Sequence, residues 1–189
     1  MMNCLSCFMA SLAFFHISEF LLAWVYMRQD WSRKSLLLSR PYSAAMACAV
    51  AEYLLEGRLL PGLKRKGQGV ACLGLAVVVC GEAVRKTAMV TAKGNFTHAL
   101  QFQRREGHVL VTHGIYRYMR HPGYAGWLLW VVGTQALLVN PFCLLAFPIV
   151  AWRFFRTRVE VEEQQLRSFF GPAYLAYAQR VPSGLPFIP

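Results

Sequence analysis

Acidic residues are scarce in this sequence, and the motifs of several soluble enzyme classes are missing from it. Aspartate and glutamate together number 9, against 20 lysines and arginines, which gives a formal net charge of +11. No glycine-rich nucleotide fingerprint follows a strand-like run, and strand and helix patterns do not alternate, which argues against a soluble Rossmann-type methyltransferase or dehydrogenase. The G-x-S-x-G and H-E-x-x-H motifs of common hydrolases are also absent.

Metal-binding patterns are incomplete as well. Cys4 and Cys7 form one C-x-x-C pair, but no second pair completes a zinc site, so we expect the cysteines to be unpaired packing residues. The histidines between positions 98 and 121 match no common zinc-ligand spacing. The sequence therefore predicts no metal site.

The excess positive charge has a particular placement. In a soluble protein, such a charge would suggest nucleic-acid binding. Here the lysines and arginines lie mainly between and after long apolar runs, as expected for cytosolic loops that face anionic lipid headgroups. We therefore expect contact with membrane lipid and no nucleic-acid partner.

Long apolar runs occupy much of the first half of the chain. The sequence is 56% hydrophobic, above the roughly 45–50% of soluble domains. Runs at 5–27, 41–60 and 70–90 are long enough to span the roughly 30 Å apolar core of a bilayer. The N-terminus lacks the basic region of a cleavable signal peptide, so we expect the first run to stay as a membrane helix.

Charged residues inside these runs are expected to face other helices rather than lipid. Glu19 is such a residue in the first run. Glu52 and Glu56, in the second run, are four positions apart and share one helix face. We expect these two glutamates to pair with Arg85 or Lys86 of the third run.

The second half combines a polar segment with a further apolar region. The stretch 93–121 is basic, rich in histidine and too long for a simple hairpin turn, which is typical of a functional loop. The apolar region 122–155 is broken by Asn140-Pro141, and we interpret it as a tight helical hairpin. The remainder, 156–189, is amphipathic and then rich in proline.

These segments predict an all-α integral membrane protein that forms a single domain over 1–189. About five transmembrane helices are expected, three within 1–92 and two in the hairpin 122–155, followed by C-terminal helices. The side that holds most of the lysines and arginines should be the cytosol, which places the loop 93–121 and the C-terminus there.

One constellation of motifs is more specific than the rest. Its central piece is 108–126, with the sequence HVLVTHGIYRYMRHPGYAG. Further pieces lie at 14–19 (FFHISE), 82–86 (EAVRK), 95–98 (NFTH), 140–141 (NP), 152–158 (WRFFRTR), 162–163 (EE) and 181–188 (VPSGLPFI). The pieces extend over nearly the whole chain, so a resemblance built on them is not a local match.

Together these motifs resemble the isoprenylcysteine carboxyl methyltransferase family of the eukaryotic endoplasmic reticulum, in the short form typical of plants. The resemblance implies that 93–189 forms a methyltransferase core that uses S-adenosyl-L-methionine. It implies that the substrate is the farnesyl- or geranylgeranyl-cysteine carboxylate at the C-terminus of prenylated proteins. It also implies a multi-pass protein of the endoplasmic reticulum membrane whose active site faces the cytosol.

Two other functions stay open from the sequence. The R-H-P-x-Y-x-G and E-E pieces alone are shared with phospholipid methyltransferases and some membrane sterol reductases. A phospholipid N-methyltransferase, or a non-catalytic relative that only binds membrane partners, is therefore the alternative to carboxyl methylation.

The resemblance also implies roles for individual residues. Arg158 is expected to bind the substrate carboxylate, and Arg158 and Glu162 are the expected catalytic residues. The expected cofactor-binding residues are Gln101, His108, Val109, Leu110, Val111, Tyr116, His121, Pro122, Gly123, Tyr124 and Glu162.

Elementary chemistry is compatible with these roles. An α-carboxyl group has a pKa of about 3.3–3.7 and is ionised at neutral pH, so its methylation needs no general base. The reaction needs a carboxylate oxygen aligned with the sulfonium methyl group and shielded from water. The planar guanidinium of Arg158 can bind both carboxylate oxygens. A helix-surface ion pair with Glu162, worth about 0.3–0.5 kcal/mol, is the alternative use of that side chain.

Overall fold

Seven α-helices, five of them long, build the part of the chain that the structure, a computed structural model, describes: residues 2–188. No β-strand occurs within these residues, which confirms the predicted all-α class. The long helices are α1 (Cys4–Tyr26), α2 (Arg40–Leu59), α4 (Gln68–Ala92), α5 (Pro122–Leu138) and α6 (Pro141–Phe170). The short ones are α3 (Pro61–Lys66) and α7 (Pro172–Arg180).

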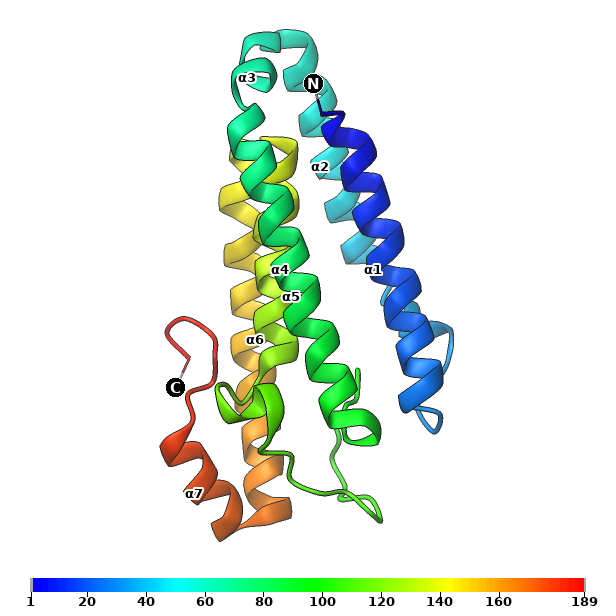
Figure 1. Cartoon of the computed structure of the whole chain (residues 1–189), viewed down its shortest axis with the longest axis vertical. Helices are drawn as coiled ribbons and strands as arrows, with labels where there is room; N and C mark the ends of the chain where they lie inside the picture. Colours follow the sequence, from blue (N-terminus) through cyan, green and yellow to red (C-terminus); the bar gives the residue numbers. More distant parts are fainter. Residues whose placement is uncertain (1, 189) are drawn as a thin grey trace.

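The long helices run roughly along the longest axis of the molecule (Figure 1). Helices α4, α5 and α6 lie together, and α1 and α2 lie beside them. The chain starts near α3 at one end of the bundle. The segment after α4, helix α7 and the C-terminal part of the chain lie toward the opposite end, which we call the α7 end.

Helices α4 and α5 approach each other closely because glycines line their contact. A Cβ atom at Gly74 would lie 2.3 Å from the backbone nitrogen of Leu137, and one at Gly81 would lie 2.6 Å from the carbonyl oxygen of Gly126. A larger residue cannot occupy either position unless a helix moves. Small residues at helix contacts are typical of membrane proteins, where close backbone approach stabilises the bundle.

Two helical segments within residues 2–188 are long and apolar enough to cross a membrane, Cys4–Tyr26 and Gln68–Asn95. Helix α5 has 17 residues, or about 25 Å at 1.5 Å per residue, which is less than the roughly 30 Å of a bilayer core. Large apolar side chains are nevertheless exposed along the bundle, among them Leu73 and Phe142. The long helices thus occupy the predicted apolar segments, and five membrane spans stay a prediction.

Helix α6 extends farther than the predicted hairpin. The hairpin was expected to end at 155, yet α6 continues as one helix of 30 residues to Phe170. Pro148 lies inside this helix. From 149 to 170 the sequence contains neither glycine nor proline, the residues that most often end a helix, so the helix continues until Gly171. The amphipathic helix expected after 155 is therefore the second half of α6.

The end of the bundle opposite the α7 end is closed by charged side chains of α2 and α3. The Glu52 carboxylate accepts hydrogen bonds from the backbone nitrogens of Phe142 and Cys143, at 2.8 and 2.9 Å, and so caps the start of α6. The Lys64 ammonium lies 2.6 Å from Glu56 and also donates to the last carbonyl groups of α5. These contacts hold the turn between α5 and α6.

The prediction that Glu52 and Glu56 pair with Arg85 or Lys86 is therefore wrong. Both basic residues instead bind Glu19, at 2.8 Å and 2.5 Å. The two glutamates lie near the end of α2 that faces α3, whereas Arg85 and Lys86 lie in the part of α4 nearer the α7 end. Separation along the helix axes prevents the predicted pairing.

The close contact of α4 and α5 gives a direct prediction. Gly81→Ala should reduce the free energy of unfolding by about 1–3 kcal/mol, because the added methyl group forces the two helices apart. Gly69→Ala is the matched control in the same helix, since nothing lies within 4 Å of a Cβ atom there. Thermal unfolding in detergent should show a lower midpoint for the first variant only. Equal midpoints would contradict the tight contact.

Candidate functional site

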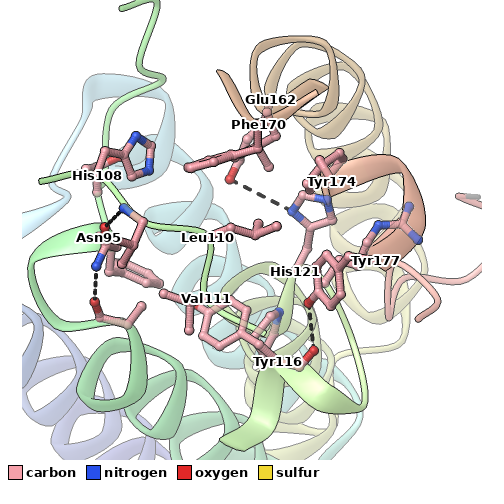
Figure 2. A pocket seen from close by; sticks show the side chains of 18 of the residues that line it. Asn95, His108, Leu110, Val111, Tyr116, His121, Glu162, Phe170, Tyr174 and Tyr177 are labelled. Carbon is pink, nitrogen blue, oxygen red and sulfur yellow. Dashed lines mark hydrogen bonds and ion pairs between the residues drawn. The ribbon is translucent and has the colours of Figure 1, made fainter. Parts of the chain in front are cut away.

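An open cavity lies at the α7 end, between the end of α4, the start of α5, the second half of α6 and α7 (Figure 2). It contains about 720 Å³ of space that no atom fills, part of which is open to solvent. Every predicted cofactor residue except Gln101 lines it: His108, Val109, Leu110, Val111, Tyr116, His121, Pro122, Gly123, Tyr124 and Glu162. The fold thus brings a continuous loop and a distant helix to one place.

Asn95 anchors the loop that forms one wall of this cavity. Its side-chain nitrogen donates to the carbonyl oxygen of Ala92, the last residue of α4, at 3.3 Å. Its side-chain oxygen accepts a hydrogen bond from the backbone nitrogen of Val109 at 2.9 Å (Figure 2). Asn95 therefore ties the irregular segment 108–111 to the rigid end of a helix.

His108 presents an unpaired nitrogen at this wall. Its ring packs against the rings of Phe169 and Phe170, with centroids 5.9 and 5.1 Å apart. Burial lowers the pKa of His108, and the nearby Arg104 and Arg105 lower it further, so the ring is neutral at neutral pH. Its buried Nδ1 has no hydrogen-bond partner among residues 2–188. A ligand in the cavity can supply that partner.

A buried ion pair fixes His121 at the base of the cavity. The Glu163 carboxylate accepts hydrogen bonds from Arg120 Nε at 2.8 Å and from His121 Nε2 at 2.9 Å. The other ring nitrogen of His121 lies 3.9 Å from a Glu162 oxygen, and the ring stacks on Tyr124 at 5.8 Å. Glu163 thus orients the imidazole, while Glu162 stays directed toward the cavity (Figure 2).

The Tyr124 hydroxyl joins the two predicted catalytic residues. It accepts a hydrogen bond from Arg158 Nε at 2.8 Å and donates one to the Glu162 carboxylate. A second guanidinium nitrogen of Arg158 donates to the carbonyl oxygen of His98. No direct ion pair between Arg158 and Glu162 forms in the described part of the chain. The arginine therefore lies at the border of the cavity, held in place by hydrogen bonds.

Behind Arg158 lies a cluster of charges around Glu19. This fully buried carboxylate accepts two hydrogen bonds from Arg85, one from Lys86 and one from His98, all between 2.5 and 2.8 Å. Arg85 also donates to the carbonyl oxygen of Gly123 at 2.9 Å. The cluster connects α1 and α4 to the cavity. Its motifs were visible in the sequence, but their convergence on one carboxylate was not.

Gln101 is the predicted cofactor residue that does not line the main cavity. It lines an adjoining cavity near the end of α1, together with Asp30 and Arg105. The two cavities share Asn95, Thr97 and His108 as lining residues. Gln101 therefore lies beside the main cavity rather than in its wall.

Helix α7 contributes a wall that the sequence did not predict for the site. Tyr174 and Tyr177, three positions apart on one helix face, are both buried and line the cavity. The Tyr177 hydroxyl donates to the carbonyl oxygen of Tyr116 at 2.6 Å (Figure 2). Burial raises the pKa of Tyr177 to about 12, so the hydroxyl stays protonated and remains a donor. Their spacing was the available signal.

The arrangement suits a ligand with flat, polar and cationic parts. Aromatic rings around the cavity can stack on a planar group or face a cation. The Glu162 carboxylate can accept hydrogen bonds, and the Arg158 guanidinium can bind an anion at the border. No group of three or more potential metal ligands occurs within residues 2–188. The geometry thus favours an organic cation inside the cavity and a bound carboxylate at its border, next to Arg158.

Comparisons with known proteins point to one family. Residues 73–168 match the model described as the isoprenylcysteine carboxyl methyltransferase (ICMT) family. The chain is 46% identical to Protein-S-isoprenylcysteine O-methyltransferase B of Arabidopsis thaliana, over 94% of this chain and 90% of that protein. It is 45% identical to the Homo sapiens Protein-S-isoprenylcysteine O-methyltransferase, over 96% of this chain and 64% of the human protein.

A solved structure shares the fold. It is described as the eukaryotic intramembrane Ras methyltransferase ICMT without a monobody, and it superposes with a TM-score of 0.95 at 39% sequence identity. The match covers 98% of this chain and 67% of that one. The arrangement of the helices around the cavity is therefore shared almost completely.

The Glu163 ion pair gives a prediction about stability. Glu163→Gln should reduce the free energy of unfolding by about 1–3 kcal/mol, because it weakens the charged hydrogen bonds that Arg120 Nε and His121 Nε2 donate to this buried carboxylate. Glu160→Gln is the control on the same helix: Glu160 is exposed, and within residues 2–188 its one ion pair is with the exposed Arg156. Its effect should stay below about 1 kcal/mol. Thermal unfolding measures both, and similar midpoints would argue against a buried pair.

Proposed function

Because this chain belongs to the isoprenylcysteine carboxyl methyltransferase family, we propose that it methylates the C-terminal prenylcysteine carboxylate of prenylated proteins with S-adenosyl-L-methionine as donor. The chain is an O-methyltransferase, as its relatives are named. The observation that carries the proposed mechanism is the Tyr124 hydroxyl, which joins the Arg158 guanidinium to the Glu162 carboxylate. A substrate anion and a cofactor can therefore meet on its two sides.

The residues of the main cavity fit the proposed cofactor. When bound, the cofactor supplies a methyl group on a sulfonium, and Tyr116 and Tyr124 offer ring faces for that cation or for the adenine. Glu162 can accept from the amine or a ribose hydroxyl, and the unpaired His108 nitrogen can complete another polar contact. Pro122 and Gly123, in the first turn of α5, bring the backbone close to this space.

Arg158 provides the site for the acceptor. Its Nε and one terminal nitrogen are held by Tyr124 and His98, which restricts rotation of the guanidinium. The other terminal nitrogen has no hydrogen-bond partner within residues 2–188 and can donate to a carboxylate oxygen. Since the acceptor carboxylate is already ionised, the protein has to orient it and exclude water rather than remove a proton.

We also propose a membrane topology that suits the two reactants. We place residues 1–92 and the hairpin 122–155 in the bilayer as about five spans, with the loop 93–121 and the C-terminal helices in the cytosol. A farnesyl or geranylgeranyl chain gains about 0.8 kcal/mol per buried CH₂ in lipid, so the acceptor reaches Arg158 from the bilayer. The water-soluble cofactor enters from the cytosol. The endoplasmic reticulum is the proposed membrane.

The role of Arg158 is tested by substitution. Arg158→Ala should reduce carboxyl methylation at least about 100-fold, because the carboxylate loses its positioning cation. Binding of S-adenosylhomocysteine should stay close to that of the wild type. Arg156→Ala is the control, since Arg156 is exposed two positions away and pairs with Glu160. The assay is radiolabel transfer from S-adenosylmethionine to N-acetyl-S-farnesylcysteine.

The outcomes separate the competing functions. Full activity of Arg158→Ala would overturn the role of the guanidinium. A folded wild-type protein that binds S-adenosylhomocysteine but methylates only amine lipids would instead be a phospholipid N-methyltransferase. Failure of the wild type to bind S-adenosylhomocysteine would indicate a non-catalytic relative.

The role of Glu162 is tested by cofactor affinity. Glu162→Ala should weaken S-adenosylhomocysteine binding about 10- to 100-fold, as expected when a charged hydrogen-bond acceptor is lost. Glu160→Ala removes an exposed carboxylate from the same helix and should leave affinity unchanged. Isothermal titration calorimetry in detergent measures both. Unchanged affinity of Glu162→Ala would refute its role as a cofactor ligand.

A further inference from the structure

A network of three polar side chains lies beside the main cavity. Arg105 donates from two guanidinium nitrogens to the two oxygens of Asp30, each at 2.6 Å. One of these nitrogens also donates to the side-chain oxygen of Gln101 at 2.6 Å. Asp30 follows α1, whereas the other two residues belong to the loop after α4, so the network joins segments distant in sequence.

The network determines the orientation of the Gln101 amide, that is, whether its oxygen or its nitrogen faces Arg105. Arginine has donors and no acceptor, so the group that meets Arg105 must be the amide oxygen. The amide nitrogen of Gln101 is consequently turned away from Arg105. Its nearest partner is the carbonyl oxygen of Ala99 at 3.4 Å, which is a long hydrogen bond. An amide N–H donor is thus available in the wall of the adjoining cavity, which shares lining residues with the main cavity.

The loop that carries Gln101 and Arg105 is fastened at two edges. At the α6 edge, Arg104 donates to the carbonyl oxygen of Phe169 at 3.1 Å and lies over the Phe170 ring. At the α1 edge, Arg105 binds Asp30 through two guanidinium nitrogens. The residues from 96 to 113 form neither helix nor strand, so these anchors take the place of secondary structure.

We infer that Asp30 is a positioning residue for the methyl donor: through Arg105 it holds Gln101 so that the amide N–H donates to an oxygen of the bound cofactor. This rests on the proposed function, because it takes S-adenosylmethionine to occupy the main cavity and to extend into the adjoining cavity that Gln101 lines. It adds a residue outside the segment 73–168 that the family model matches. Asp30 touches neither the main cavity nor the proposed acceptor site.

Stability alone does not account for this network. The side chains of Arg105 and Asp30 are 31% and 29% exposed, and ion pairs with that much solvent contact contribute little to folding. A fork geometry with two short hydrogen bonds instead provides directional control, because it fixes the plane of the guanidinium. The network therefore orients a side chain rather than stabilising the fold.

The experiment measures cofactor affinity in a double-mutant cycle on the full chain in detergent. Asp30→Asn should weaken S-adenosylhomocysteine binding about five- to tenfold, while the thermal midpoint stays unchanged. In a Gln101→Ala background the same substitution should have no further effect, because the donor that Asp30 positions is already missing. In turnover, Asp30→Asn should raise the KM for S-adenosylmethionine and leave kcat and the KM for N-acetyl-S-farnesylcysteine unchanged.

Two further variants complete the test. Glu106→Gln makes the same charge change on the same loop, at a residue without an ion pair in the described part of the chain, and should bind like the wild type. The exchanged pair, Asp30→Arg with Arg105→Asp, should not restore affinity, because an aspartate at 105 offers no donor to the Gln101 oxygen. Wild-type affinity of Asp30→Asn, or equal losses with and without Gln101, would overturn the inference. Absence of binding in the wild type would overturn the proposed function itself.

Discussion

The hydrogen bonds around the Glu19 carboxylate hold the membrane helices to the site. Inside the protein, this negative charge is matched by Arg85, His98 and a neighbouring lysine, all of which donate to it. A buried charge is costly unless it is both paired and hydrogen-bonded, so none of these groups can be changed alone. Arg85 continues to the Gly123 carbonyl, and the His98 carbonyl receives Arg158. The positions of the first turn of α5 and of the Arg158 guanidinium therefore depend on Glu19 of α1.

The apolar pattern was sufficient to locate the helices and the fold class, because long apolar runs have few alternatives to a helix in a membrane. It could not identify charge partners. Glu52 and Glu56 were assigned to an interior face, and they do face other helices, but their partners depend on how far each helix is shifted along its neighbour. The Lys64 side chain, on a helix of its own, reaches Glu56 only because α3 folds back over the turn.

The wall of the cavity was largely predictable, because most of its residues belong to one continuous motif, 108–124. Glu162, on the following helix α6, completes that set. Contributions from isolated positions were harder to find. The face of α7 with Tyr174 and Tyr177 carries only a three-residue spacing, which a plain packed helix also shows. Gln101 lies beside the cavity rather than in it. Family motifs identify residue types at a site, whereas orientation depends on tertiary contacts that no local pattern contains.

The unbroken course of α6 from Pro141 to Phe170 has a geometric consequence for the two proposed binding residues that it carries. Arg158 and Glu162 are four residues apart on this one rod, so their axial offset is about 6 Å and is set by backbone hydrogen bonds. A hinge or loop between them would let thermal motion vary that offset. A continuous helix instead keeps these two side chains at a fixed separation along its axis, so the proposed donor and acceptor sites need no domain closure to hold their distance.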